Sequence, residues 1–582
     1  MISKIMTIIQ QRSNNSSLTS DFSESVSPLL QRIYRARGAS TDSDVDYNLQ
    51  SLEKPTSLKH LSEAVALLVT AIREQQRVLI VGDFDADGAT SCALSILALR
   101  AMGLQHVDFL VPNRFEYGYG LTPEIVDVAK TYQPNLIVTV DNGIASVDGV
   151  AHAKSLGFNV IVTDHHLPPT VLPIADAIVN PNQQGCEFPS KNLAGVGVIF
   201  YLLSALRSRL RELNWFVEQA INEPNMANYL DLVALGTVAD VVPLDRNNRI
   251  LVHQGIQRVR AGKARPGILA LLEVAGKNYQ RLTSQDFGFI VGPRLNAAGR
   301  LDDISLGIAC LLTDDVALAR ELAAQMDGLN RERRSIEASM QAEAMVSLNA
   351  LTLDETELPW GLCLLEDDWH QGVVGILASR IKDKYHRPVI AFAEVDDNTI
   401  KGSARSIEGL HIRDALDVIA TQNPDILQKF GGHAMAAGLS LERKNFTRFA
   451  QLFDKAVRDL LTQDQLKEVL LTDGELSTQE ISLMSAHALA AAGPWGQRFP
   501  EPVFNGYFTL VSQRIVGEKH LKMTLSFLDD PQKIIDAIAF NVDIDCWPNA
   551  DAKQINAVYQ LSVNEFRGNE TEQLMVRHIE VV

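Results

Sequence analysis

Long apolar segments and closely spaced cysteines are both missing from this chain. No run of about eighteen apolar residues occurs in the 582 residues, and the Ser- and Asn-rich N-terminus lacks a signal-peptide core. The five cysteines are scattered without a C-x-x-C spacing, which argues against a zinc knuckle and against a disulfide framework. We therefore expect a cytoplasmic protein with reduced cysteines, in which 46% apolar and 21% charged residues form three or four domains.

Positive charge is also scarce. The formal net charge of −18 speaks against a nucleic-acid partner, because phosphate binding depends on Lys and Arg. Residues 246–300 are an exception, with ten basic and two acidic side chains, and they predict a locally basic channel. A solvated helix face remains the alternative for Arg258, Lys263 and Arg265. Arg294 and Arg300 are expected in a glycine-rich loop, where backbone can approach a phosphate.

Acidic residues and histidines follow a series of short Val- and Ile-rich runs. Residues 77–81, 136–140 and 160–163 read as strands separated by helix-length segments, which predicts a buried parallel sheet. Ligands of such sheets bind beyond the carboxyl ends of the strands. The side chains expected there, or in the V-A-D-V-V-P-L segment at 238–244, are Asp83, Asp85, Asp87, Asp141, Asp164, His165, His166 and Asp240.

Carboxylate oxygens with imidazole form the ligand set of a Mn²⁺ or Mg²⁺ pair. Three carboxylates at alternate positions repel one another unless a cation lies among them, so D-F-D-A-D-G is more than a turn. Taken alone, Asp141 with Gly143 suits a simple turn as well as it suits a metal site. For Asp240 the alternative to a metal ligand is a helix cap. The predicted metal ligands are Asp83, Asp85, Asp87, Asp141, His165 and Asp240. The predicted catalytic residues are Asp87, Asp141 and His166, with His166 contacting the scissile phosphate.

The second half of the chain predicts three further parts. Residues 314–350 have helical periodicity and predict a long connecting helix, interrupted near Gly328. A second α/β unit follows, with strands at 361–365 and 388–392 and a helix from 372. Loops at 401–406 and 431–433 are expected to suit phosphate oxygens, with a hydroxyl from Ser403 and a planar fork from Arg405.

Alternation of apolar and polar residues predicts an all-β C-terminal part. Strands are expected at 507–511, 521–527, 558–563 and 573–579, spaced as in a small barrel. Phe508, Phe527 and Phe566 could stack on nucleobases, although core packing is the stronger expectation for each.

Seven motifs, in order, resemble the DHH phosphoesterase superfamily, and within it the branch of single-strand-specific 5′→3′ DNA exonucleases. They are D-F-D-A-D-G-A-T-S, N-R-F-E-Y-G-Y-G-L, V-D-N-G, D-H-H, A-L-G-T-V-A-D-V-V-P-L, G-P-R-L-N-A-A-G-R-L and K-F-G-G-H-A-M-A-A-G-L. The resemblance implies an α/β fold with a parallel-sheet DHH domain, a connecting helix, a DHH-associated (DHHA1) domain and an OB-like barrel. We divide the chain into a partly flexible lead-in (1–45) and these four parts at 46–312, 313–355, 356–462 and 463–582.

The resemblance further implies metal-dependent release of 5′-mononucleotides from single-stranded DNA, in recombination and repair. The residues implied for nucleic-acid binding are Arg114, Tyr119, Arg294, Asn296, Arg300, Ser403, Arg405 and His433. A monomer is expected, with a single-strand-binding protein and a RecQ-like helicase as possible partners. Many relatives have a histidine where this chain has Val81, so Asp83 is the candidate replacement ligand.

Two other functions remain open. One is a different DHH activity, on short oligoribonucleotides or cyclic dinucleotides, although such small substrates need neither the barrel nor the long helix. The other is a non-catalytic DNA-binding scaffold, against which the nearly complete ligand set argues.

Overall fold

The computed structural model describes residues 7–13, 21–112, 120–354 and 358–582. The chain forms two compact units. The larger unit comprises residues 11–328 and 472–582, and the smaller unit comprises residues 1–10 and 329–471. None of the described helices is long and apolar enough to cross a membrane.

A five-stranded parallel sheet forms the centre of the larger unit, as predicted. Its strand order is β3-β2-β4-β5-β6, and every neighbouring pair is parallel. The strands are β2 (Val78–Gly82), β3 (Val107–Leu110), β4 (Leu136–Val140), β5 (Asn159–Thr163) and β6 (Ala177–Val179). All residues of β2 and β4 are buried, which explains why these strands read as continuous apolar runs.

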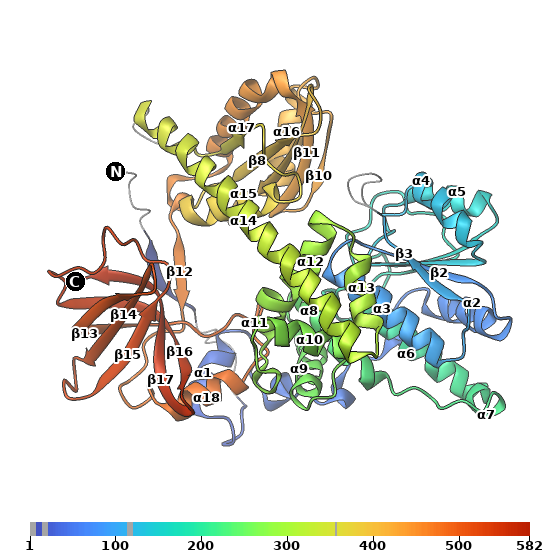
Figure 1. The fold of residues 1–582 in the computed structure, drawn as a ribbon, viewed down its shortest axis with the longest axis horizontal. Helices are drawn as coiled ribbons and strands as arrows, with labels where there is room; N and C mark the ends of the chain where they lie inside the picture. The colour runs from blue at the N-terminus through green and yellow to red at the C-terminus, as the bar shows by residue number, and fades with distance from the viewer. Residues whose placement is uncertain (1–6, 14–20, 113–119, 355–357) are drawn as a thin grey trace. The chain divides into compact units, whose positions relative to one another are not determined.

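Helices cover both faces of this sheet (Figure 1). One face packs Leu79, Val81 and Val162 against α4 (Pro123–Ala129) and α5 (Val147–Ser155). The other helices of this part of the larger unit are α1 (Pro28–Arg35), α2 (Leu61–Arg73), α3 (Ala86–Ala101), α6 (Gly195–Glu212), α7 (Trp215–Glu218), α8 (Leu230–Ala239), α9 (Arg246–Arg260), α10 (Pro266–Val274), α11 (Ser284–Asp286), α12 (Gly292–Leu301) and α13 (Ser305–Leu312).

The long helix α14 (Val316–Asp354) spans 39 residues. It continues through Gly328, so the predicted interruption is wrong. A Cβ added at Gly328 would meet nothing within 4 Å, so this glycine is not required for close packing. Because a single exposed glycine costs only about 1 kcal/mol in a helix, the long periodic sequence around it prevails.

A second five-stranded sheet forms the core of the smaller unit, in the order β10-β11-β9-β8-β7. Its strands are β7 (Leu362–Leu365), β8 (Val389–Glu394), β9 (Thr399–Arg405), β10 (Lys429–Gly432) and β11 (Ala436–Glu442). Only β7 and β8 pair in parallel. Residues 401–405 were expected in a loop, but they lie on β9 and alternate between buried and accessible.

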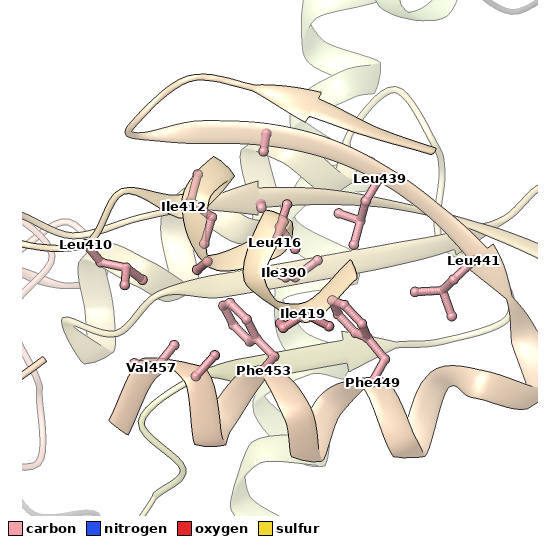
Figure 2. Packing of buried hydrophobic residues seen from close by; sticks show 14 of the residues in the cluster. Ile390, Leu410, Ile412, Leu416, Ile419, Leu439, Leu441, Phe449, Phe453 and Val457 are labelled. Atoms are coloured by element: carbon pink, nitrogen blue, oxygen red, sulfur yellow. The ribbon is translucent and has the colours of Figure 1, made fainter. Parts of the chain in front are cut away.

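Helices also cover both faces of this second sheet. α16 (Ile412–Gln422) and α17 (Phe446–Leu460) pack their apolar residues against one face, where Phe449 and Phe453 lie beside Ile419 (Figure 2). On the opposite face, α15 (Val374–Tyr385) and Met340, Ala344 and Leu348 of α14 pack against β7 and β8. Ser403 and Arg405, with side chains on that second face, therefore lie beside α15.

The C-terminal part is a closed five-stranded barrel, as predicted, in the order β13-β14-β15-β17-β16. The strands are β13 (Phe504–Val516), β14 (His520–Phe527), β15 (Ile534–Ala539), β16 (Gln554–Phe566) and β17 (Asn569–Val581), accompanied by helix α18 (Leu483–Ala491). Phe508 and Phe527 form an edge-to-face pair in the barrel core, whereas Phe566 is 66% exposed. Before the barrel, β12 (Val469–Thr472) pairs with β1 (Ile8–Gln11) of the lead-in.

Candidate metal centre and phosphate pocket

The turn from β2 into α3 presents three aspartates. Asp85 is the N-cap of α3, and its carboxylate accepts hydrogen bonds from the backbone N–H groups of Asp87 (2.9 Å) and Gly88 (3.1 Å). Asp87 is buried and accepts two further bonds, from the N–H of Gly195 (2.6 Å) and of Val196 (2.9 Å). These two donors belong to the first turn of α6, so a helix N-terminus holds the Asp87 carboxylate.

Asp141 follows β4 in a left-handed backbone conformation, with φ of 62°. Such a conformation is uncommon outside glycine, and it persists where surrounding structure enforces it. Gly195 packs against it, because a Cβ added there would lie 2.5 Å from the Asp141 Cβ. Asn142 braces the same turn by donating to the carbonyls of Val81 (3.0 Å) and Val140 (2.9 Å).

In the D-H-H sequence after β5, Asp164 supports His166, and His165 is a potential metal ligand. Asp164 accepts from the N–H groups of His165 and His166, and its Oδ1 lies 2.7 Å from His166 Nδ1. The other Asp164 oxygen accepts from the N–H of Ile144. Asp164 thus positions His166, because both of its carboxylate oxygens bond to groups of the protein. This arrangement orients the His166 ring in the way that a second carboxylate orients metal-site histidines.

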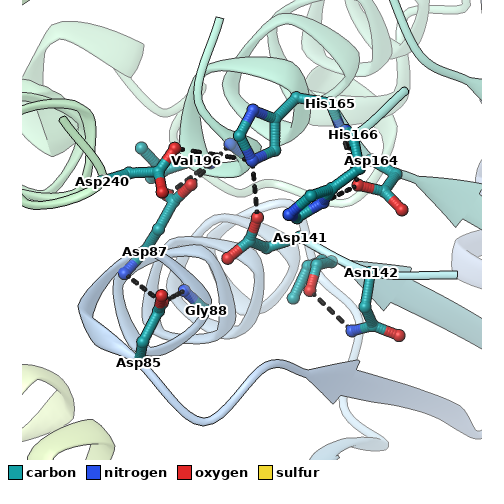
Figure 3. A network of polar contacts seen from close by, with 12 residues as sticks. Asp85, Asp87, Gly88, Asp141, Asn142, Asp164, His165, His166, Val196 and Asp240 are labelled. Carbon is teal, nitrogen blue, oxygen red and sulfur yellow. Dashed lines mark hydrogen bonds and ion pairs between the residues drawn. The ribbon is translucent and has the colours of Figure 1, made fainter. Parts of the chain in front are cut away.

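His165 and the aspartates of three other segments, Asp87, Asp141 and Asp240, come together in one cluster (Figure 3). His165 Nε2 lies 3.1 Å from Asp141 Oδ1 and 3.5 Å from Asp240 Oδ2. Asp240 is the C-cap of α8, which agrees with the alternative of a helix cap. Its carboxylate nevertheless faces the cluster.

The cluster contains three groups of potential ligand atoms, and within each group the atoms lie within 4.8 Å of one another. They are Asp141 with His165 and His166, Asp87 with His165 and Asp240, and Asp83 with Asp85 and Asp141.

Burial and mutual repulsion perturb these carboxylates strongly. Burial, followed by the charge of Asp85, raises the pKa of Asp87 to about 7. Burial and the charge of Asp87 raise the pKa values of Asp141 and Asp240 well above their ordinary value. Burial alone would raise the pKa of Asp164 too, but the His166 hydrogen bond and charge lower it. Buried carboxylates that repel one another fit a centre that a cation completes.

The donor set therefore fits divalent metal ions. Its carboxylates and imidazole suit Mn²⁺ and Mg²⁺, and shared residues link the three groups as a pair of ions would require. Val81, at the position where the family resemblance implied a histidine, lies inside the buried strand β2. Asp83, two residues on, groups with Asp85 and Asp141, which fits a replacement ligand.

The residues predicted for nucleic-acid binding occupy different environments. Asn296 accepts a hydrogen bond from the N–H of Ala86 (2.8 Å) and so holds the first turn of α3 beside the metal cluster. Arg294 lies in helix α12 rather than in a loop, is 8% exposed, and forms an ion pair with Asp327 (2.8 Å). Arg300 lies near the end of α12 and is partly exposed. Arg114 and Tyr119 fall outside the described residues.

The prediction of a glycine-rich loop around Arg294 and Arg300 is wrong, because these residues lie in helix α12. The glycines of α12 permit close helix packing, since a Cβ added at Gly299 would lie 2.0 Å from the carbonyl oxygen of Phe84. Several arginines of the expected basic channel form contacts within the fold instead. Arg260 donates to Leu282 O, and Arg265 donates to Leu311 O and pairs with Asp314. These guanidinium groups satisfy carbonyls and carboxylates of the fold.

Ser403 and Arg405 form a compact polar cluster with Ser379 within the smaller unit. The Arg405 guanidinium donates to Ser379 Oγ (3.2 Å), Ser403 Oγ (3.1 Å) and the carbonyl of Ala404 (2.8 Å). Gly375, in the first turn of α15, leaves room for it, because an added Cβ would lie 2.9 Å from Arg405 Nη2. Burial lowers the pKa of Arg405, and its partners in the described structure are all neutral. His433 closes the β10–β11 turn by donating its N–H to Ala436 O.

Two structural roles were not predicted from the sequence. The first is the pair of N–H donors from Gly195 and Val196, for which the small-residue run L-A-G-V-G-V was the available signal. The second is the support of the segment that follows Asp240. The N–H of Leu244 donates to Gln497 O (2.8 Å), and the Arg249 guanidinium donates to Leu244 O while lying 4.1 Å from the ring centre of Phe499. Residues far apart in sequence carry both roles.

Family models match the three predicted folded parts in order. The DHH family N-terminal domain matches residues 77–237, the DHHA1 domain residues 358–459 and the RecJ OB domain residues 472–578. The parallel sheet with its aspartate and histidine cluster, followed by these two domains, defines a DHH-family phosphoesterase.

Curated relatives and solved structures narrow this class. The single-stranded-DNA-specific exonuclease RecJ of Salmonella typhimurium is 53% identical over 98% of this chain and 99% of its own length, and that of Escherichia coli has the same identity and coverage. The crystal structure of RecJ from Thermus thermophilus in complex with Mn²⁺ matches with a TM-score of 0.79 and 28% identity, covering 100% of this chain and 80% of that one. Its complex with Mg²⁺ matches with a TM-score of 0.74, covering 99% and 78%. The chain belongs to the RecJ family of single-stranded-DNA-specific exonucleases.

Proposed function

We propose that this chain is a metal-dependent exonuclease that digests single-stranded DNA from its 5′ end and releases 5′-mononucleotides, in recombination and repair. The observation that carries the proposal is the convergence of Asp87, Asp141 and Asp240 on His165, which forms a potential ligand group with Asp87 and Asp240 and lies 3.1 Å from Asp141. The names of its relatives, which are single-stranded-DNA-specific exonucleases, support the choice of substrate.

The cluster provides a place for two divalent cations, Mn²⁺ or Mg²⁺. We assign as ligands Asp83, Asp85, Asp87, Asp141, His165 and Asp240. When bound, such a pair activates water and neutralises the charge that develops on a phosphodiester. The chain itself keeps the ligands in place, because the N-terminus of α6 holds Asp87 and the α3 cap holds the turn of Asp85.

His166 is the proposed contact to the scissile phosphate. Burial alone would lower its pKa, but the Asp164 hydrogen bond and charge raise it. A protonated imidazole donates to a phosphate oxygen and stabilises negative charge in the transition state. Asp164 is therefore a positioning residue in this scheme.

We assign the 5′-terminal phosphate to Ser403 and Arg405. Arg405 is a half-buried cation whose described partners are uncharged oxygens, and a phosphate would supply the missing anion. Its planar fork suits two phosphate oxygens, and the first turn of α15 lies beside it. This pocket supports the proposed preference for a 5′ end.

The remaining assignments are also proposals. Asn296, Arg300 and His433 would position the strand, together with Arg114 and Tyr119, which lie outside the described residues. Arg294 is better placed to hold α12 in position, because Asp327 and Ile290 O already engage its guanidinium. The domain limits given above from sequence stand as our division of the chain.

The proposed setting is the cytoplasm, with a monomeric enzyme, and with a single-strand-binding protein and a RecQ-like helicase as partners. None of the five cysteines, all of which the structure describes, forms a disulfide, which is consistent with that compartment. Co-purification with each partner, and the mass of the purified protein in solution, would test these assignments.

End-labelled linear strands and covalently closed circular strands test the function in one experiment with Mg²⁺. We expect rapid loss of a 5′ label from linear single strands, little digestion of blunt duplex, and none of circles. Digestion of circles at a comparable rate, or release of a 3′ label first, would contradict the proposal. Cleavage of dinucleotides alone would point to another DHH phosphodiesterase, and binding without cleavage to a scaffold.

A further inference from the structure

The segment that follows Asp240 turns sharply between two helices. Asp240 is the C-cap of α8 and Asp245 is the N-cap of α9. Val241 makes the turn, with φ of 60°. Among the described residues, Val241 is the one β-branched residue with a positive φ, a conformation that is an outlier for such a side chain.

The Val241 side chain does not itself explain this conformation. It is 63% exposed, so no burial is gained by the turn. A strained residue of this kind persists only where the surrounding structure over-determines it. The restraint on Val241 must therefore come from the chain on its two sides.

On the N-terminal side, α8 is fixed beside the metal cluster. A Cβ added at Gly236 would lie 2.9 Å from Asp87 Oδ1, and one added at Gly292 would lie 3.1 Å from the Ala239 Cβ. The N–H of Asp240 donates to Gly236 O (2.9 Å) and closes the last turn of the helix. Because helix ends fray, this last turn depends on the chain that follows it.

On the C-terminal side, Leu244 is held by residues 496–499, which we call the barrel-entry turn because they lead into β13. The N–H of Leu244 donates to Gln497 O (2.8 Å), and its side chain is buried. A Cβ added at Gly496 would lie 2.7 Å from Leu244 Cδ1, so Leu244 packs on bare backbone. The turn closes on itself, since the N–H of Gly496 donates to Phe499 O (2.9 Å).

An aromatic stack makes the barrel-entry turn rigid. The rings of Trp495 and Phe499 stack with centres 5.3 Å apart, and Tyr34 of α1 stacks on Phe499 at 6.2 Å. The Arg249 guanidinium lies 4.1 Å from the Phe499 ring centre and donates to Leu244 O (2.9 Å). Both backbone groups of Leu244 are therefore bonded, one to the turn and one to a cation beside it.

We infer that the barrel-entry turn is a positioning element of the metal centre, which fixes Leu244, keeps Val241 left-handed and so holds the Asp240 carboxylate toward the cluster (Figure 3). Released from Leu244, Val241 would relax to a negative φ and loosen the last turn of α8, where Asp240 lies. This inference rests on the proposed function, in which Asp240 is a metal ligand.

Calorimetric titration of the metal-free, full-length protein with Mn²⁺, without DNA, tests this role. Gly496→Ala drives a methyl group against Leu244, and Leu244→Ala removes the anchored side chain without adding an atom. Each is expected to raise the Kd for Mn²⁺ about 10-fold, as do other changes beside metal ligands. Asp240→Asn should raise it at least as much.

Cleavage should show the same division between affinity and rate. In either anchor variant the half-saturating Mn²⁺ concentration should rise about 10-fold, while kcat at saturating Mn²⁺ stays within about twofold of wild type. A merely structural role would not confine the change to metal affinity.

Val241→Asn separates positioning from stability. Asn adopts the left-handed conformation more readily than Val, so adding it to Gly496→Ala should return the Kd for Mn²⁺ to within about twofold of wild type. Val241→Asn alone should leave the Kd unchanged. Tyr34→Phe is the matched control, because it removes a hydroxyl bond to Ala492 O (2.9 Å) in the same aromatic stack without touching Leu244. It should lower the unfolding temperature and leave the Kd unchanged.

Wild-type Mn²⁺ affinity in both anchor variants, with weaker binding in Asp240→Asn, would overturn the positioning role and leave the proposed function standing. Equal weakening in Tyr34→Phe would overturn it in favour of a general loss of stability. Failure of Val241→Asn to restore affinity would overturn the route through Val241. Unchanged binding in Asp240→Asn would reject Asp240 as a ligand, and the inference with it.

Discussion

Replacement of Arg405 by Gln isolates the charge of the phosphate pocket. Gln keeps much of the side-chain volume and can still donate to Ser403 or Ser379, but it removes the cation. Arg405 is half-buried and its described partners are uncharged, so its charge contributes little to folding and is available to a ligand. We therefore expect the variant to unfold at the wild-type temperature or slightly above it.

The expected magnitude follows from one charge-assisted contact. Such a hydrogen bond contributes roughly 1.5 to 3 kcal/mol, which corresponds to a factor of about 10 to 150 in kcat/KM. The reduction should appear only for strands with a 5′ phosphate, because a 5′ hydroxyl cannot occupy the anion position. The variant should therefore lose the wild-type preference for phosphorylated ends.

The assay compares kcat/KM for one oligonucleotide with a 5′ phosphate and with a 5′ hydroxyl. Arg448→Gln is the matched control, since Arg448 is an exposed arginine of the same unit that pairs with Asp425. The control should keep the preference. If Arg405→Gln kept it too, or lowered activity equally on both ends, the terminal phosphate would bind elsewhere.

Four other outcomes are expected. Asp141→Asn should reduce cleavage by at least about 100-fold while single-strand binding in chelator stays near wild type, and near-normal turnover at saturating Mn²⁺ would reject Asp141 as a ligand. The folded pKa of Asp87, about 7, exceeds its unfolded value near 4, so the metal-free free energy of unfolding should fall as pH rises between them. Mn²⁺ should then raise the unfolding temperature more at pH 8 than at pH 6, and an equal rise would contradict this assignment. Arg249→Ala should lower the free energy of unfolding in urea by roughly 2 to 4 kcal/mol, because it removes a bond to Leu244 O and the contact with Phe499; an unchanged midpoint would show that these contacts are dispensable. Phe566→Ala should weaken binding of long strands without slowing cleavage of short ones, and no change in a binding titration would exclude stacking on this exposed ring.

The strands and their acidic ends were predictable because one physical rule governs both. A strand buried on both faces must be apolar throughout, as β2 and β4 are, so the first polar residue marks the carboxyl end. Asp83, Asp141 and Asp164 occupy those ends and meet at one edge of the sheet. Their convergence therefore follows from sequence patterns of only five residues each.

The supporting contacts were not predictable in the same way. Arg294 was expected to face a phosphate because glycines surround it, but those glycines allow helix packing, and Asp327 engages its guanidinium. The donors to Asp87 come from residues more than a hundred positions away. Such pairings depend on tertiary structure, because a small-residue run such as L-A-G-V-G-V does not show which distant residue it will contact.

Anomalous diffraction from crystals grown with Mn²⁺ tests the metal centre most directly. We predict two manganese peaks roughly 3.5 to 4 Å apart, with Asp141 in contact with both and His165, Asp87 and Asp240 around them. The Asp141→Asn crystal should lack at least one peak. The absence of manganese from this cluster, in protein that digests single-stranded DNA with Mn²⁺, would contradict the assignment of the active site.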